Sequence, residues 1–136
     1  MGPQENHISF AVGIPINEFP ATMFRNLMTL ISARADLLKK ALGTETLAIV
    51  FWRGKLWFPW FTIRESYQEA AIYRHFVYFL CEVARFQANY PAWLRYAGTG
   101  RFAMWLFLLE LGYVGRDLKE GRKLLLRNFR WLPLGG

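Results

Sequence analysis

The chain has 136 residues, of which 54% are hydrophobic and 18% aromatic, and 17 Lys and Arg against 10 Asp and Glu give a net charge of +7. This length predicts one globular domain over residues 1–136, and the many apolar side chains exclude intrinsic disorder. One cysteine excludes an internal disulfide, and together with two histidines it forms no recognisable set of metal ligands, so we expect no metal and no cofactor.

Apolar residues alternate with small or polar ones from Ile8 to Ile16. A period of two over this length predicts a β-strand with one buried face, which carries Phe10 and Val12. Pro15 lacks a backbone N–H and therefore predicts an edge or a turn at the end of this strand.

Apolar residues then recur every three or four positions from Met23 to Leu42, which predicts an amphipathic helix. Thr22 is the predicted capping residue at its start. Lys39 and Lys40 in the last turn and Gly43 beyond it are signals that end a helix.

Two short runs of β-forming residues, Leu47–Trp52 and Lys55–Phe61, are separated only by Arg53 and Gly54. A two-residue link between such runs predicts a β-hairpin. Pro59 predicts that the second run is an edge strand or ends in a bulge, because proline cannot donate a ladder hydrogen bond.

Three helices follow in the prediction, over residues 65–89, over residues 101–111, and from Asp117 to about Asn128 or Phe129. Asp117 is the predicted N-cap of the last one, since Glu120 stands at the spacing of a capping box. The order is therefore β-α-β-β-α-α-α. We expect an α+β fold in which a small antiparallel sheet of about three strands packs against a helical layer.

Cations concentrate on the last predicted helix. Between Arg116 and Trp131 there are six basic and two acidic residues, a net +4 of the chain's +7. A helical projection places apolar side chains on one side, at Leu118, Gly121, Leu125, Phe129 and Leu132. The opposite side and its flank carry the predicted binding residues, Arg116, Lys119, Arg122, Lys123, Arg127 and Arg130. Cations spaced about one helical turn apart can bind along a phosphate backbone. The alternative interpretation is that these cations only form the solvent-exposed face of an amphipathic helix.

Aromatic residues gather around the predicted hairpin. Large rings on alternating strands are most often core, but one face of a half-covered sheet would be free. Exposed rings beside cations could stack on unpaired bases, although an exposed apolar patch more often marks a protein interface. Trp52, Trp57 and Trp60 are the predicted aromatic contacts, with Phe61 as a further candidate.

No sequence pattern indicates catalysis, because nucleotide-binding loops and nucleophile motifs are missing from the chain. His75 is interpreted as a surface or boundary residue and Cys81 as a buried small hydrophobe. We therefore expect no enzyme and no catalytic residue.

The longest stretches without a charge fall far short of the roughly 18 apolar residues that a spanning helix needs. The start MGPQENH has neither the basic nor the apolar region of a secretory signal. We expect a cytoplasmic protein with no membrane partner.

Two stretches carry a family resemblance. The first is Met23–Leu27 with Leu37–Gly43, and the second runs from Phe102 to Asn128, where a turn spelled Gly-Tyr-Val-Gly precedes a spaced basic set. Together they resemble small proteins labelled virulence-related in mobile elements of Gram-positive bacteria. The resemblance implies an accessory protein of a conjugative element or phage that acts on nucleic acid or on a nucleoprotein, with counter-defence inhibitors of the anti-CRISPR type included.

Charge placement and resemblance together predict a non-catalytic basic protein that binds nucleic acid or a host nucleoprotein complex through its last helix. A host protein is a further possible partner. The alternative prediction is a protein–protein interaction or oligomerisation module whose contact surface is the aromatic hairpin.

Overall fold

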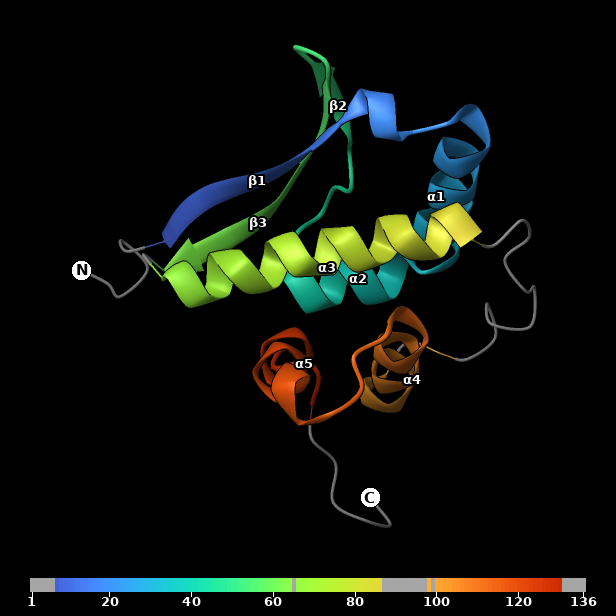
Figure 1. Cartoon of the computed structure of the whole chain (residues 1–136). Coiled ribbons are helices and arrows are strands. Elements are labelled where there is room, and N and C mark those ends of the chain that lie inside the picture. The colour runs from blue at the N-terminus through green and yellow to red at the C-terminus, as the bar shows by residue number, and fades with distance from the viewer. Residues whose placement is uncertain (1–6, 65, 87–97, 99, 131–136) are drawn as a thin grey trace.

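Figure 1 shows the computed structural model, which describes residues 7–64, 66–86, 98 and 100–130. In this part of the chain, three strands and five α-helices occur in the order β1 (His7–Pro15), α1 (Ala21–Ala33), α2 (Ala35–Leu42), β2 (Val50–Trp52), β3 (Lys55–Arg64), α3 (Tyr67–Phe86), α4 (Arg101–Leu111) and α5 (Lys119–Leu126). Two short 3₁₀ turns, η2 (Ile16–Glu18) and η4 (Arg116–Leu118), precede α1 and α5. The predicted α+β class is confirmed.

The sheet is antiparallel and has the strand order β1-β3-β2. Arg53 and Gly54 both have positive φ, 52° and 76°, as a tight two-residue hairpin turn requires, so the predicted hairpin is confirmed. β2 covers only Val50–Trp52 and is shorter than expected.

Pro59 lies in the central strand, so the prediction of an edge position is wrong and that of a bulge is confirmed. Phe10 pairs with Phe61 and Val12 with Phe58, which leaves Pro59 and Trp60 opposite the single residue Ala11. The register therefore shifts where proline offers no N–H to the ladder.

The elements form three layers. In Figure 1 the sheet lies on one side of α2 and α3, while α4 and α5 lie on the other side of these two helices. One hydrophobic core cluster includes residues from all three layers. Side chains with no exposed surface occur in each, at Leu27, Leu38, Phe58, Phe76, Leu80, Met104, Leu108 and Leu125.

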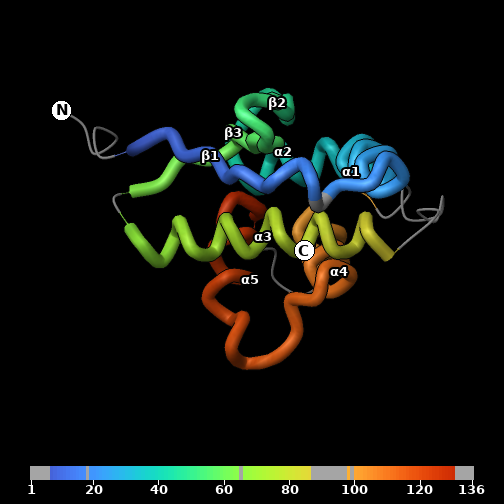
Figure 2. The backbone as a smooth tube through the Cα atoms, turned by 45° about the horizontal axis from the view of Figure 1, so that its top comes forward, coloured from blue at the N-terminus to red at the C-terminus, as the bar shows by residue number. Residues whose placement is uncertain are grey.

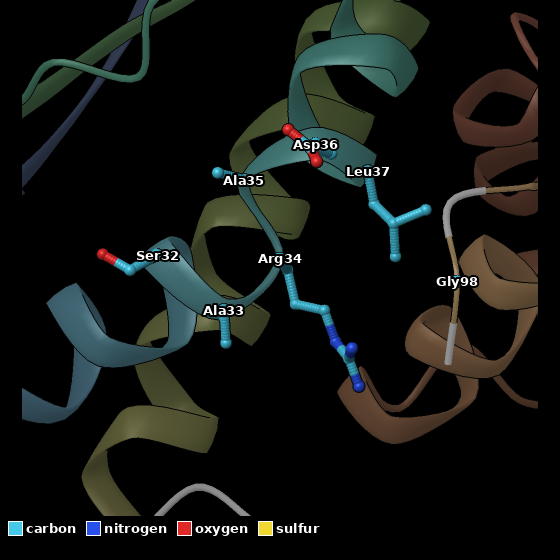
Figure 3. A pocket seen from close by; sticks show the side chains of 7 residues that line it. All are labelled: Ser32, Ala33, Arg34, Ala35, Asp36, Leu37 and Gly98. Atoms are coloured by element: carbon cyan, nitrogen blue, oxygen red, sulfur yellow. The ribbon is translucent and has the colours of Figure 1, made fainter. Parts of the chain in front are cut away.

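The first predicted helix is in fact two helices. The chain bends at Arg34, whose φ and ψ are −117° and 20°, and α2 continues in a new direction (Figure 3). The Arg34 side chain is buried and reaches α4, where its Nη2 lies 3.5 Å from Glu110 Oε2. Thr22 is not the cap of α1, because Pro20 occupies that position without a side-chain hydrogen bond. Gly43 ends α2 in the left-handed conformation, as predicted.

A small cavity of 120 Å³ lies beside this bend and is lined by Ser32–Leu37 and Gly98. Figure 3 shows the Arg34 side chain running toward α4 while Ser32 and Asp36 point elsewhere. The polar groups of the lining therefore do not converge on a common point.

The long helix α3 begins after Ser66, whose Oγ accepts a hydrogen bond from the backbone N–H of Glu69 at 3.2 Å. This is the N-cap arrangement that satisfies a free donor of the first turn. Seven of its residues are buried, which confirms the predicted central place of this helix: Ala70, Tyr73, Phe76, Val77, Leu80, Cys81 and Ala84. The last three residues of the predicted range, 87–89, lie outside the described residues.

Among the residues that the structure describes, no helix is both long and apolar enough to cross a membrane.

Candidate nucleic-acid interface

Helix α5 is held against the core by a close approach at Gly121. A Cβ atom at this position would lie 2.8 Å from Cε1 of Tyr113, so only glycine allows the helix to sit this close. Leu125, Leu126 and Phe129 are buried on the same side of the segment. The predicted apolar face is thus confirmed, apart from Leu132, which lies outside the described residues.

The start of α5 differs from the prediction. Asp117 belongs to the 3₁₀ turn η4, and Leu118 flanks α5 without a side-chain cap, so the predicted capping box is wrong. Gly115, with φ of 97°, leads into that turn. Arg122 Nη1 donates hydrogen bonds to the carbonyl oxygens of Tyr113 at 3.3 Å and Gly115 at 2.7 Å. Arg122, predicted as a binding residue, therefore uses its guanidinium to fix this loop.

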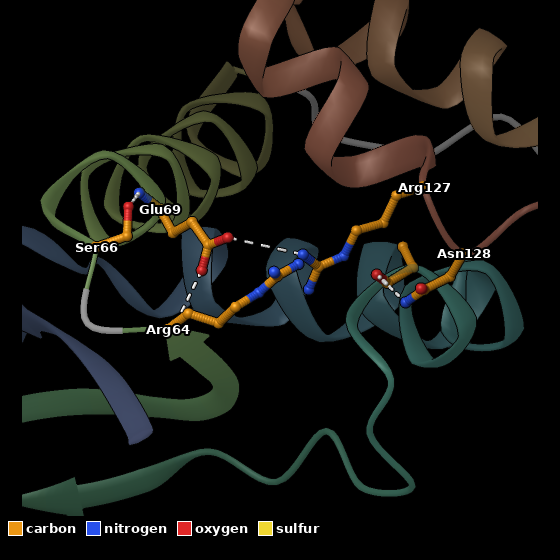
Figure 4. Close-up of polar contacts among 6 residues, drawn as sticks. Arg64, Ser66, Glu69, Arg127 and Asn128 are labelled. Atoms are coloured by element: carbon orange, nitrogen blue, oxygen red, sulfur yellow. Dashed lines mark hydrogen bonds and ion pairs between the residues drawn. The ribbon is translucent and has the colours of Figure 1, made fainter. Parts of the chain in front are cut away.

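The end of α5 is tied to the end of α2. Asn128 Nδ2 donates hydrogen bonds to the carbonyl oxygens of Lys40 at 3.1 Å and Ala41 at 3.0 Å (Figure 4). Lys40 Nζ lies 5.4 Å from the centroid of the Phe129 ring. Lys40 thus lies beside the end of α5, and the exposed Lys39 precedes it in the last turn of α2, where both lysines are predicted only as helix-stop signals.

Five of the six predicted cations are exposed, and Arg122 is the half-buried exception. We call these five together with the two lysines of α2 the basic surface: Lys39, Lys40, Arg116, Lys119, Lys123, Arg127 and Arg130. Lys123 lies 4.0 Å from Glu120, but both side chains are more than half exposed. Such a surface pair contributes little stability, so it holds the lysine only weakly.

A cleft of 260 Å³ lies at the edge of the basic surface, between α3 and α5. Its lining consists of Arg64, Gln68, Glu69, Ile72, Glu120, Lys123, Leu124 and Arg127. Three cations and two carboxylates give it a net positive charge.

Glu69 organises this cleft. Its Oε1 accepts the backbone N–H of Arg64 at 3.0 Å, and its Oε2 lies 3.7 Å from Nη1 of Arg127 (Figure 4). The Arg64 guanidinium itself has no hydrogen bond or ion pair to any described residue. The Glu69 carboxylate therefore pairs with only one of the two guanidinium groups, that of Arg127, and the Arg64 guanidinium can still bind an anion.

The charges of the cleft reach the buried Tyr73 of α3. Burial raises the pKa of its hydroxyl above the ordinary value, and the positive charge of Arg127 acts in the opposite direction. Glu69 and Arg64 act on the same hydroxyl with opposite signs. The Tyr73 hydroxyl stays protonated at neutral pH and contributes no charge to the cleft.

Tyr113, against which α5 packs, carries a buried hydroxyl with no hydrogen-bond partner among the described residues. Tyr113→Phe is expected to raise the free energy of unfolding by about 1 kcal/mol, because it removes an unpaired polar group. Burial also raises the pKa of Tyr113 far above its ordinary value. Above about pH 10 the Tyr113 hydroxyl loses its proton in the unfolded chain but keeps it in the folded chain, so the free energy of unfolding falls as the pH rises.

Urea unfolding of both proteins near pH 8 and near pH 10.5 tests this prediction. The wild-type chain should lose more stability between the two pH values than Tyr113→Phe does. A variant that is less stable than the wild type near pH 8 would contradict it.

The two residues considered for catalysis both belong to α3. His75 is exposed and stacks on Phe79 at a ring distance of 4.3 Å, which confirms its interpretation as a surface residue. Cys81 is buried, as predicted. Within the described part of the chain, no three His, Cys, Asp or Glu residues lie together in a way that could hold a metal ion.

The predicted aromatic contacts divide into two groups. Trp52 is 56% exposed and Trp57 is half-buried, but Trp60 and Phe61 are only 2% and 3% exposed, so these two are not surface contacts. Trp60 Nε1 instead donates a hydrogen bond to the carbonyl oxygen of Ala48 at 2.8 Å. Figures 1 and 2 both show β2 at one end of the molecule and the segment that leads from α4 into α5 at the other, so the hairpin and the cations of α5 lie on separate surfaces.

Comparison with known proteins gives no match: no family model, no curated protein and no solved structure is similar to this chain. The resemblance to virulence-related proteins of mobile elements therefore stays a prediction.

Proposed function

We propose that this protein is a non-catalytic module that binds the phosphate backbone of nucleic acid, free or within a host nucleoprotein, through the basic surface. The observation that supports this most is the joining of two distant segments. Asn128 holds the end of α5 against the end of α2, so Lys39 and Lys40 extend the row of cations that begins at Arg116. A surface built from two segments can follow a backbone over more phosphates than one short helix.

The cleft beside α5 suits a phosphate group. Arg64 and Arg127 line this cleft, and each planar guanidinium group can bind two oxygens of one phosphate. Lys123 adds a third positive charge. Glu69 holds Arg127 in place when no ligand is bound. A phosphate would compete with this carboxylate for the same guanidinium.

The wider role, that of an accessory or counter-defence protein of a mobile element, rests on the sequence resemblance alone. Its physical basis would be the same surface, because a basic protein can compete for the contacts that a nuclease complex makes with its guide RNA or DNA. We propose such an element as the setting in which the binding acts.

Removal of three exposed cations tests the proposal. Lys39→Gln, Lys119→Gln and Lys123→Gln in one chain should weaken binding of a fluorescent DNA duplex by about 10²–10³-fold near 0.1 M salt. The slope of log affinity against log salt should become shallower by about 2.7, since each lost contact removes about 0.9. Fluorescence anisotropy over a salt series measures both quantities.

A matched control removes the same charge elsewhere. Arg25→Gln, Arg74→Gln and Arg85→Gln change exposed residues of α1 and α3 outside the basic surface and should leave the slope almost unchanged. Glu69→Gln should raise the affinity, because Arg127 loses its competing carboxylate. Equal losses in the two triple variants, or none in either, would show that the basic surface is not the binding site.

A further inference from the structure

One face of the sheet is open. α2 and α3 pack against the face that carries Val12, Phe58 and Phe61, and no helix of the described chain packs against the other face. The open face is formed by alternate residues of the three strands: Ser9, Ala11, Gly13, Val50, Trp52, Lys55, Trp57, Pro59 and Thr62. On β1 these residues are small, so the open face is flat beside Trp52 and Trp57.

Trp57 is held in a fixed position on this face. Trp57 lies over Gly13, where a Cβ atom would come within 2.8 Å of its ring. Its Nε1 donates a hydrogen bond to the carbonyl oxygen of Trp52 at 3.1 Å, and the two rings are 6.4 Å apart. Trp52 takes part in this bond through its backbone oxygen, and its side chain is 56% exposed.

The charges on this face are all positive. The Arg53 guanidinium lies 4.6 Å from the centroid of the Trp52 ring, and Lys55 Nζ lies 5.5 Å from that of Trp57. The sequence contains no Asp or Glu between Thr46 and Arg64, and β1 contains none either. Aromatic rings beside cations without carboxylates are complementary to an anionic ligand that has flat apolar groups.

We propose that the open sheet face binds single-stranded nucleic acid, whose unpaired bases stack on Trp52 and Trp57 while its phosphates contact Arg53 and Lys55. Stacking of bases on exposed rings is the common means by which proteins bind single strands, and it needs no base-specific hydrogen bonds. This site is separate from the cations of α5, because β2 and α5 lie on opposite sides of α3 in Figure 1.

The positive charge of the open face also argues against a second copy of the chain as its binding partner. Two sheet faces brought together would place Arg53 and Lys55 of both copies in one interface with no carboxylate from either sheet. Like charges in an interface are costly, whereas a phosphate backbone neutralises them. β2 offers only three residues for pairing edge to edge, which is little for a stable strand addition.

The test compares two exposed tryptophans. Trp52→Ala should weaken binding of a fluorescent oligothymidylate of about 12 nucleotides by about tenfold or more, the effect expected from losing one stacked base. Trp105→Ala removes a 40% exposed tryptophan of α4 and should not change this affinity. Lys55→Gln should make the salt dependence shallower by about 0.7.

Single-strand binding by the open sheet face can be disproved without affecting the proposed binding of duplexes by the basic surface. Trp52→Ala should leave duplex binding through the basic surface unchanged, and the triple lysine variant should keep its dependence on Trp52. An unchanged affinity of Trp52→Ala for the single strand would overturn the inference. So would sedimentation showing an oligomer or a protein complex that Trp52→Ala dissociates, because the face would then be a protein interface.

Discussion

Trp60→Ala is expected to lower the free energy of unfolding by about 3–5 kcal/mol, whereas Trp52→Ala should lower it by less than about 1 kcal/mol. Trp60 is 2% exposed and packs edge to face on Phe58 at a ring distance of 5.2 Å. Its loss leaves a large cavity and also frees the carbonyl oxygen of Ala48, which now accepts the indole N–H. Trp52 is 56% exposed, so truncation removes little buried area.

Urea unfolding followed by circular dichroism measures the difference between the two variants. In thermal unfolding, Trp60→Ala should melt at least about 10 °C lower than the wild type, and Trp52→Ala within a few degrees of it. Similar losses for both tryptophans would contradict the assignment of Trp60 to the core and of Trp52 to the surface.

The error over Phe61 has a local cause. Buried and outward positions alternate along β3 from Leu56 to Trp60, and a period of two predicts Phe61 on the side of Trp57. The bulge at Pro59 inserts one extra residue, so that Trp60 and Phe61 are both buried. Trp60 itself follows the alternation of Leu56 and Phe58, which places it on their buried face. Proline signalled that a bulge was one of two outcomes, but no period-two pattern shows which face the next residues take.

Features that depend on neighbouring residues were predictable. The hairpin follows from Arg53 and Gly54, which take the positive φ values of a tight turn, and the end of α2 follows from Gly43. The bend at Arg34 was not predictable in the same way. Both sides of the bend carry apolar residues at helical spacing, and the partner that draws Arg34 inward, Glu110, is 76 residues away.

The candidate site shows the same division. The row of cations from Arg116 to Arg130 is a local pattern and is exposed as predicted, apart from Arg122. The addition of Lys39 and Lys40 depends on the hydrogen bonds of Asn128 across 87 and 88 residues. No pattern within either segment reveals that contact, because an asparagine after a helix has many possible partners.

Gly121→Leu is expected to lower the free energy of unfolding by about 3 kcal/mol, the upper part of the usual range for overpacking. The first added carbon would lie 2.8 Å from Cε1 of Tyr113 and 3.7 Å from Cγ2 of Ile72. Tyr113 cannot move aside, because it is 1% exposed and its ring packs against Phe79 at 4.9 Å. Gly121→Ala should be much milder, since the better helix propensity of alanine offsets part of the clash by about 1 kcal/mol.

Glu120→Leu provides the matched control for Gly121→Leu, because it introduces the same side chain one position earlier, where the native residue is 58% exposed. Its unfolding free energy should stay within about 0.5 kcal/mol of the wild type. In Gly121→Leu, displacement of α5 would also strain the bonds from Asn128 to α2, so the hydrogen exchange of the α5 amides should accelerate more than that of α3. Equal stability of the two leucine variants would mean that α5 does not rely on the close approach of Gly121 to Tyr113, and the geometry of the basic surface would then need another support.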